Sequence, residues 1–242
     1  MSASAQTTVV AFGDSIAAGL GARGRAFPRV LAERLGAELD DRSLSATKVS
    51  RSLELAVADP PVADVALVMH GVSEALPRVP EHLLARLPRR WRGAGRLDPR
   101  PYFSSDPRKR MIQRADSWAR TRTKVSLMRL AGTERWMTLP EYRRDLGLLL
   151  EALDGCGQVV VLGPTPIDDR GFPGASRALA EYAAVTRAVA ADAGATFIAL
   201  DAVLDRWDDL LADHFHPTAS GHAKIAERVL EAVGRATVPR AG

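Results

Sequence analysis

Short apolar runs alternate with amphipathic segments along this chain, and no other feature of the sequence restricts the fold as much. The apolar runs have the length and composition of buried strands and cover residues 7–12, 63–72, 158–166 and 195–204. Apolar residues at three-four spacing predict helices over residues 27–36, 139–155, 175–194 and 221–234. A weaker strand is expected within 37–45 and a short helix near 50–58. Alternating strands and helices predict an α/β fold with a central parallel sheet covered on both faces.

Length and composition indicate one globular domain. The chain has 242 residues, 46% of them hydrophobic and 26% charged, enough for one sizeable core, and we expect a single domain over residues 1–242. Cys156 is the only cysteine, so an internal disulfide is excluded, and no residue spacing indicates a metal site. The first residues contain no basic segment followed by a long apolar core, so we expect a cytoplasmic protein without a transmembrane segment.

One basic segment, residues 81–139, interrupts the alternation. It contains fifteen lysines and arginines against five aspartates and glutamates, which gives it a net charge of +10. Because the net charge of the whole chain is +4, the remaining residues carry a net charge of −6. It also holds Trp91, Trp118 and Trp136. We interpret it as an inserted helical and loop cap that attracts an anionic substrate or carrier. The alternative is a solvated surface without a binding role.

The stretch VVAFGDSIAAGLGARG, residues 9–24, predicts a corner where a strand turns into a helix. Gly13 permits a tight turn, and Asp14 and Ser15 are residue types that cap helices. In one interpretation this is an ordinary loop whose polar side chains bind free backbone N–H groups. In the other, the Ser15 hydroxyl lies at the carboxyl end of the first strand, where open α/β sheets bind ligands.

A serine nucleophile needs a base, and the sequence LLADHFHPTASGHAKIAERVL near the end of the chain offers one. Asp213 precedes His216 by three residues, in a turn that Pro217 helps to fix. A serine hydroxyl is a weak nucleophile until an imidazole takes its proton, and a carboxylate holds that imidazole in the correct tautomer. We therefore predict that Ser15, His216 and Asp213 are the catalytic residues.

These two motifs resemble the GDSL, or SGNH, hydrolase superfamily. Its first block is a Gly-Asp-Ser at the end of strand one, matched by residues 13–15, and its last is Asp-x-x-His-Pro, matched by Asp213, His216 and Pro217. The resemblance covers the chain in order except for residues 81–139. It implies a three-layer α/β/α flavodoxin-like sandwich and acyl transfer by serine without a cofactor.

The resemblance also implies an oxyanion hole, and here the sequence departs from the family. Lys48 stands where glycine is expected and Ser73 where asparagine is expected, two residues after Gly71. The implied donors are the backbone N–H groups of Ser15 and Lys48 and the side chain of Ser73. Alternatively, Ser73 and Glu74 are only the N-cap of a helix.

Further residues have less specific expectations. His70 is interpreted as a packed core residue. The candidate substrate-binding residues are Asp14, Gly71, Arg108, Lys109 and Arg110.

The acyl acceptor separates the functional alternatives. With water as acceptor, the chain is an ester or thioester hydrolase that works through an acyl-enzyme. With a sugar, glycoside or other alcohol as acceptor, it is an acyltransferase, for which an acyl carrier or coenzyme A would be the donor. A third alternative is a non-catalytic module whose basic segment binds an anion or nucleic acid, because arginines interleaved with aromatics bind single strands. We expect a small-molecule ester rather than a nucleic acid.

Overall fold

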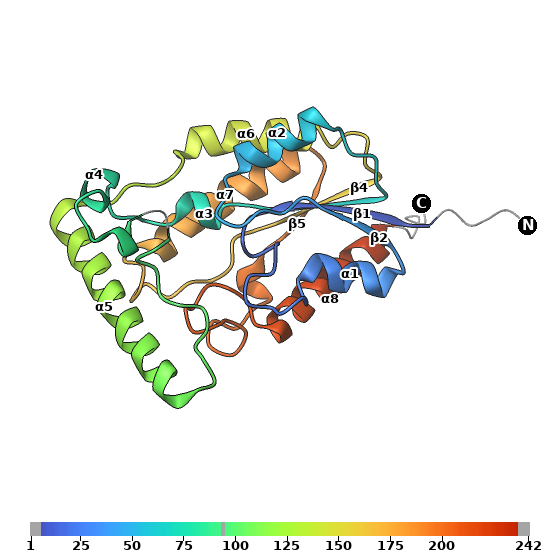
Figure 1. Cartoon of the computed structure of the whole chain (residues 1–242). Coiled ribbons are helices and arrows are strands. Elements are labelled where there is room, and N and C mark those ends of the chain that lie inside the picture. Colours follow the sequence, from blue (N-terminus) through green and yellow to red (C-terminus); the bar gives the residue numbers. More distant parts are fainter. Residues whose placement is uncertain (1–5, 93–94, 237–242) are drawn as a thin grey trace, which may run out of the picture.

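A computed structural model describes residues 6–92 and 95–236 and contains a five-stranded sheet between two layers of helices (Figure 1). All strand pairs are parallel, in the order β2-β1-β3-β4-β5. The strands are β1 (Thr8–Gly13), β2 (Glu38–Asp41), β3 (Val65–Met69), β4 (Gln158–Leu162) and β5 (Thr196–Ile198). The predicted α/β fold with a central parallel sheet is confirmed.

The central strands are apolar because both of their faces are covered. Every residue of β3 is buried, as are the last five residues of β1. In their register, Val9 pairs with Val65 and Gly13 with Met69, so the two carboxyl ends are level. Residues that follow these two strands therefore meet at one edge of the sheet.

Helices cover both faces of the sheet (Figure 1). On one face lie α2 (Val49–Ala58), α6 (Leu139–Glu151) and α7 (Ala175–Asp192), and on the other lie α1 (Phe27–Leu35) and α8 (Ala219–Ala236). Each of these helices was expected from the sequence, four of them from their apolar spacing. Local signals define several ends: Thr138 and Glu141 form a capping box at the start of α6, and Gly36 ends α1 in the left-handed conformation with φ 62°.

Two local expectations are corrected by the structure. Residues 14–24 form successive turns rather than a helix, and the first helix begins only at Phe27. Gly19, Gly21 and Gly24 all have positive φ angles, which a helix cannot accommodate. The apolar run at 195–204 contains the short strand β5 and then a 3₁₀ turn, η2 (Leu200–Ala202), instead of one long strand.

Within its described residues, the basic segment forms the helical elements α4 (Glu81–Leu84), η1 (Arg89–Trp91) and α5 (Pro107–Ala131). Asp106 caps α5, which forms an arm at the edge of the molecule (Figure 1). A small apolar cluster separate from the main core is built from Val79, Leu97 and Met128 together with partly buried Leu83, Leu84, Leu87, Trp91 and Leu127. The carboxyl-terminal part of α5 is thus packed against α4, whereas its first turns are exposed.

His222, in the first turn of α8, is fully buried. Its Nδ1 accepts the N–H of Phe27 at 3.2 Å, which ties α8 to the start of α1. Burial, and then the charge of nearby His216, lower the pKa of His222 from 6.5 to about 4. The folded protein therefore holds this imidazole neutral, whereas the unfolded chain binds a proton below about pH 6.5.

We expect acid to destabilise the protein through His222. Because the folded-state pKa is depressed, the stabilising contribution is complete above pH 6.5 and is lost as the pH falls toward 4. At pH 5 the loss is about 2 kcal/mol relative to pH 7. Urea unfolding at both pH values should show that His222→Asn, which keeps an acceptor for Phe27 and does not titrate, loses about 2 kcal/mol less than the wild type. Equal losses in the two proteins would contradict this assignment.

Candidate active site

Ser15 lies just beyond the carboxyl end of β1, beside the carboxyl end of β3. The sheet order reverses between these two strands, and open α/β sheets bind ligands at such a point. Gly13 allows the close approach of the chains, because a Cβ there would lie 2.5 Å from the Cβ of Ala17 and 2.8 Å from the carbonyl oxygen of Met69. The sequence thus turns sharply at the place where the sheet exposes a ligand-binding edge.

Ser15, His216 and Asp213 form a continuous hydrogen-bonded chain. The Ser15 Oγ lies 2.8 Å from His216 Nε2, and His216 Nδ1 lies 2.7 Å from Asp213 Oδ2. A carboxylate only accepts hydrogen bonds, so the Nδ1 proton points to Asp213 and Nε2 is left to accept from Ser15. His216 and Asp213 are buried, and Ser15 is partly exposed. The three groups predicted from opposite ends of the sequence are brought together.

The loop that carries Asp213 and His216 is fixed by backbone hydrogen bonds. Asp213 Oδ1 accepts the backbone N–H groups of Phe215 and His216 at 3.3 and 3.2 Å. The N–H of Leu211 donates to the His216 carbonyl at 2.7 Å, and the N–H of Ala212 donates to the carbonyl of Pro101 at 3.2 Å. This last bond connects the loop to the basic segment.

Ser73 is directed toward Asp14. Its hydroxyl donates to Asp14 Oδ2 at 2.8 Å and its N–H donates to the same oxygen at 3.3 Å, while Asp14 Oδ1 accepts the N–H of Ile16. A hydroxyl has a single proton, so in this arrangement Ser73 has none left for an oxyanion. This contact favours a supporting role for Ser73 over the oxyanion role that the sequence predicts.

The surroundings of Asp14 likewise favour a supporting role over the substrate-binding role that the sequence predicts. The side chain is buried, with 1% of the residue exposed, and both of its oxygens accept hydrogen bonds from the protein itself. Burial raises the pKa of Asp14, although the charge of His70 opposes the rise. Asp14 therefore holds the segment after β3 against the segment after β1 and offers no surface to a ligand.

Glu74 is a buried residue whose importance was not evident from the sequence. Its carboxylate accepts the N–H of Gly71 at 2.9 Å and the N–H of Val49 at 2.7 Å, and it lies 3.3 Å from His70 Nδ1. Burial raises its pKa, but the hydrogen bond and charge of His70 and the backbone donors outweigh burial, so the pKa is lowered. Glu74 thereby caps the short helix α3 (Val72–Ala75) and positions the start of α2, where Lys48 is the N-cap. The N-cap of α3 is Gly71, and Glu74 is the third residue of this helix rather than the N-cap itself.

Two neighbours of Glu74, His70 and Gly71, were also assigned roles from the sequence. His70 is buried as expected, and its Nε2 lies 2.8 Å from Ser52 Oγ. Gly71 has a φ of 115°, and its N–H donates to Glu74, so this N–H is not free to bind a ligand. That Gly71 contacts the substrate stays a prediction.

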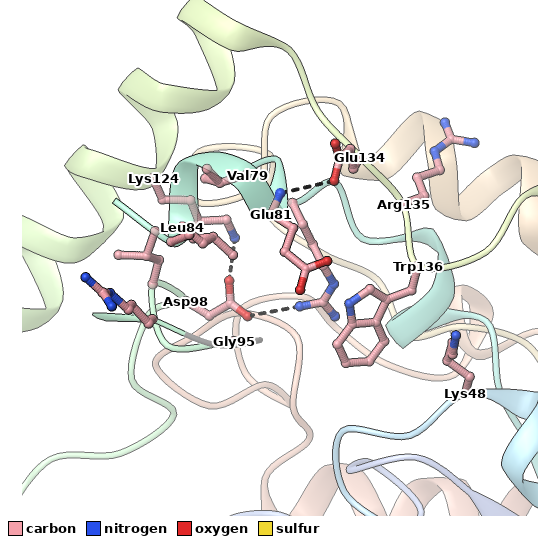
Figure 2. A pocket seen from close by; sticks show the side chains of 14 residues that line it. Lys48, Val79, Glu81, Leu84, Gly95, Asp98, Lys124, Glu134, Arg135 and Trp136 are labelled. Atoms are coloured by element: carbon pink, nitrogen blue, oxygen red, sulfur yellow. Dashed lines mark hydrogen bonds and ion pairs between the residues drawn. The ribbon is translucent and has the colours of Figure 1, made fainter. Parts of the chain in front are cut away.

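Arg108, Lys109 and Arg110 lie in the exposed first turn of α5. None of the three lines the cavity of about 500 Å³ that lies between the basic segment and the body of the protein. That cavity is lined instead by Lys48 and Arg78, which precede the basic segment, and by residues of the segment itself, among them Arg92, Lys124 and Arg135 (Figure 2). The charge of the basic segment thus reaches this cavity through residues that the sequence did not single out.

The part of the chain that the structure describes contains neither a candidate metal site nor a candidate membrane-spanning helix. Within residues 6–92 and 95–236, no three His, Cys, Asp or Glu side chains gather in a way that could hold a metal ion. None of the described helices combines the length and apolar character needed to cross a bilayer.

Comparison with known proteins identified one family model and many similar structures. The model of the GDSL-like Lipase/Acylhydrolase family matches residues 11–224. No curated protein matched the sequence significantly.

Three of the similar structures are those of bacterial esterases or lipases. A lipase/acylhydrolase from Enterococcus faecalis has a TM-score of 0.61 at 16% identity, over 95% of this chain and 97% of its own. A carbohydrate acetylesterase from Sinorhizobium meliloti has a TM-score of 0.60 at 15% identity, over 96% and 100%. A catalytic mutant of an acetylxylan esterase from Geobacillus stearothermophilus has a TM-score of 0.57 at 18% identity, over 97% of each chain. At these sequence identities the similarity shows a shared fold and nothing beyond it.

The position of Ser73 generates a prediction that separates a supporting role from an oxyanion role. Ser73→Ala removes the hydroxyl donor from buried Asp14, so we expect the free energy of unfolding to fall by about 1–3 kcal/mol. We expect kcat/KM for a simple ester to fall less than about tenfold, because the single proton of the hydroxyl is donated to Asp14. Urea unfolding and steady-state kinetics measure the two effects. A loss of about a hundredfold or more in kcat/KM with unchanged stability would instead identify Ser73 as an oxyanion donor.

Proposed function

Because the chain belongs to the GDSL-like lipase/acylhydrolase family, we propose that this esterase-type enzyme hydrolyses a small-molecule acyl ester through a covalent intermediate on Ser15. The observation that carries the proposal is the hydrogen-bonded chain from Ser15 through His216 to Asp213, with distances of 2.8 and 2.7 Å. The three side chains have the contacts and the order that a serine nucleophile, its base and the carboxylate that orients the base require.

In the proposed first step, Ser15 Oγ attacks the carbonyl carbon of the ester while His216 Nε2 takes the hydroxyl proton. The carbonyl oxygen becomes an oxyanion, and Asp213 stabilises the imidazolium that forms. The tetrahedral intermediate collapses when its bond to the alcohol oxygen breaks, and His216 gives its proton to that oxygen. The acyl group is then an ester of Ser15.

Two backbone N–H groups are proposed as oxyanion donors. Within the described residues, neither the N–H of Ser15 nor that of Lys48 donates a hydrogen bond to the protein, so both are available. Glu74 supports the second donor indirectly, because it binds the N–H of Val49, the residue after Lys48. The asparagine that the family normally supplies is absent, and the loss of one such donor lowers turnover roughly 100- to 1000-fold in other enzymes. We therefore expect slower acylation than with three donors.

In the second step, water attacks the acyl-enzyme while His216 takes one of its protons. The bond to Ser15 Oγ breaks, His216 returns the proton to Ser15, and a carboxylic acid is released. The same chemistry accepts a thioester as donor, and an alcohol in place of water makes the enzyme an acyltransferase. We put the hydrolase first because the partly exposed Ser15 is accessible to water.

Replacement of the three proposed catalytic residues tests the mechanism. We expect Ser15→Ala and His216→Ala each to reduce kcat for a p-nitrophenyl ester by a factor on the order of 10⁴ or more, because both act in the same step. Asp213→Asn should also be strongly impaired but should lose less than either, because the imidazole remains even though its orientation and charge are less supported. Stopped assays with purified variants and circular dichroism as a folding check measure these effects.

The matched control is Ser50→Ala, a serine in the first turn of α2 outside the proposed hydrogen-bonded chain. It should retain wild-type turnover. Full activity in folded Ser15→Ala would rule out the serine mechanism, whatever the other variants do.

A further inference from the structure

Arg78 follows α3 and has more hydrogen-bond donors than partners. Its guanidinium carries five N–H donors, and within the described residues one of its nitrogens, Nη2, donates a hydrogen bond, to the Ser73 carbonyl at 3.3 Å. Its Nε is buried without a partner, and its nearest ion-pair contact, Nη1 to Asp98 Oδ2, is 3.9 Å long. Burial lowers the pKa of Arg78, but an arginine stays charged at neutral pH. A charged group with unused donors thus lies at the wall of a cavity.

The aromatic ring of Trp136 holds this guanidinium in place. The Arg78 Cζ lies 3.7 Å from the centre of the ring, within the range of a cation–π contact. A planar guanidinium against a ring keeps its N–H edges free for a carboxylate, which it can bind with two parallel hydrogen bonds. Both side chains line the cavity of about 500 Å³ (Figure 2).

The other charges of the cavity leave an excess of positive charge near Arg78. Lys124 Nζ lies 2.6 Å from Asp98 Oδ1, so these two largely neutralise each other. Burial favours neutral Asp98, but Lys124 and then Arg78 outweigh burial and lower its pKa, so it stays ionised. Lys48 makes no ion pair with any described residue. In all, five cationic and three acidic side chains line the cavity.

Two contacts connect the cavity to the proposed reaction centre. Arg78 binds the carbonyl of Ser73, whose hydroxyl binds Asp14, the residue before Ser15. Lys48, whose backbone N–H is proposed as an oxyanion donor, also lines the cavity. A substrate bound to Ser15 therefore has this cavity within reach.

We propose that Arg78, stacked on Trp136, binds a carboxylate of the substrate, so that the enzyme prefers esters that carry a carboxylate over neutral esters. This inference rests on the proposed esterase function of Ser15 and adds the substrate class to it. The carboxylate takes the unused N–H groups of the guanidinium, and Lys48 adds a second positive charge at the same cavity.

Matched pairs of esters test the proposal with the purified full-length protein. One pair, p-acetoxybenzoate and p-acetoxybenzamide, places the carboxylate or the neutral amide on the alcohol side. The other pair, umbelliferyl hemiglutarate and umbelliferyl butyrate, places a carboxylate or a neutral alkyl group on the acyl side. We expect kcat/KM of the wild type to be higher for the anionic member of at least one pair, by about tenfold or more, as expected of a hydrogen-bonded charge.

Variants then assign the preference to Arg78. In Arg78→Gln the ratio of kcat/KM between the two esters should fall to near one, and in Arg78→Lys, which keeps the charge without the planar edge, it should be intermediate. The matched control is Arg143→Gln on α6, whose arginine pairs with Asp192 and does not line the cavity; its ratio should equal that of the wild type. Inhibition of the wild type by benzoate but not by benzamide needs no variant and should show the same preference.

Each of the other possible outcomes contradicts the carboxylate site, and the last of them also contradicts the esterase function. Hydrolysis of both neutral and anionic esters with a ratio near one in the wild type would overturn the carboxylate site and leave the esterase function standing. An equal loss on both esters in Arg78→Gln, with the ratio unchanged, would place Arg78 at the reaction centre or in the fold instead. Loss of the preference in a triple reversal of Arg108, Lys109 and Arg110, but not in Arg78→Gln, would move the anion site to the tip of α5. If the wild type hydrolyses no ester of either pair, the esterase proposal fails together with the inference.

Discussion

Buried Asp14, together with the backbone and side-chain donors around it, is the constraint on which the candidate active site depends. It joins the segment after β3 to the segment after β1, at the point where the strand order reverses. Asp14 is fully buried, and burial alone disfavours its charged form, so the donors around it are needed to hold it in place. Ser15 is the next residue along the chain. The position of the proposed nucleophile is therefore set by a carboxylate that itself never reaches the substrate.

The sequence was sufficient to predict the sheet, its helices and the meeting of Ser15, His216 and Asp213. The periodicity of apolar residues is strong in strands and helices that are buried on one or both faces. The motif around Ser15 and the motif of Asp213 and His216 lie at opposite ends of the chain, and few other residues could have paired with either. Side-chain direction was not predictable in the same way. Whether Ser73 faces the substrate or Asp14 depends on local backbone geometry, and Glu74 has ordinary N-cap spacing in the sequence although it connects α2 to α3.

The basic segment shows how net charge differs from local charge. Its excess of positive residues was evident in the sequence, but the first turn of α5, where three cations follow one another, is exposed and lies outside the cavity. Lys124 is buried against Asp98, so its charge is used in an ion pair within the segment. The backbone bond from Ala212 to Pro101, by contrast, connects the segment to the loop of His216. Arg78, which precedes the segment in the sequence, lines the cavity with unused donors and contacts the Ser73 carbonyl.

The central claim is that acyl groups pass through Ser15, and the most direct measurement is to identify the covalent intermediate. The protein is mixed with umbelliferyl butyrate, quenched in acid within the first turnovers, digested and analysed by mass spectrometry. The account predicts a butyryl group on the peptide that contains Ser15, formed together with a burst of umbelliferone and absent in His216→Ala. Turnover of the ester without any acylated peptide, or acylation at another residue, would contradict the account.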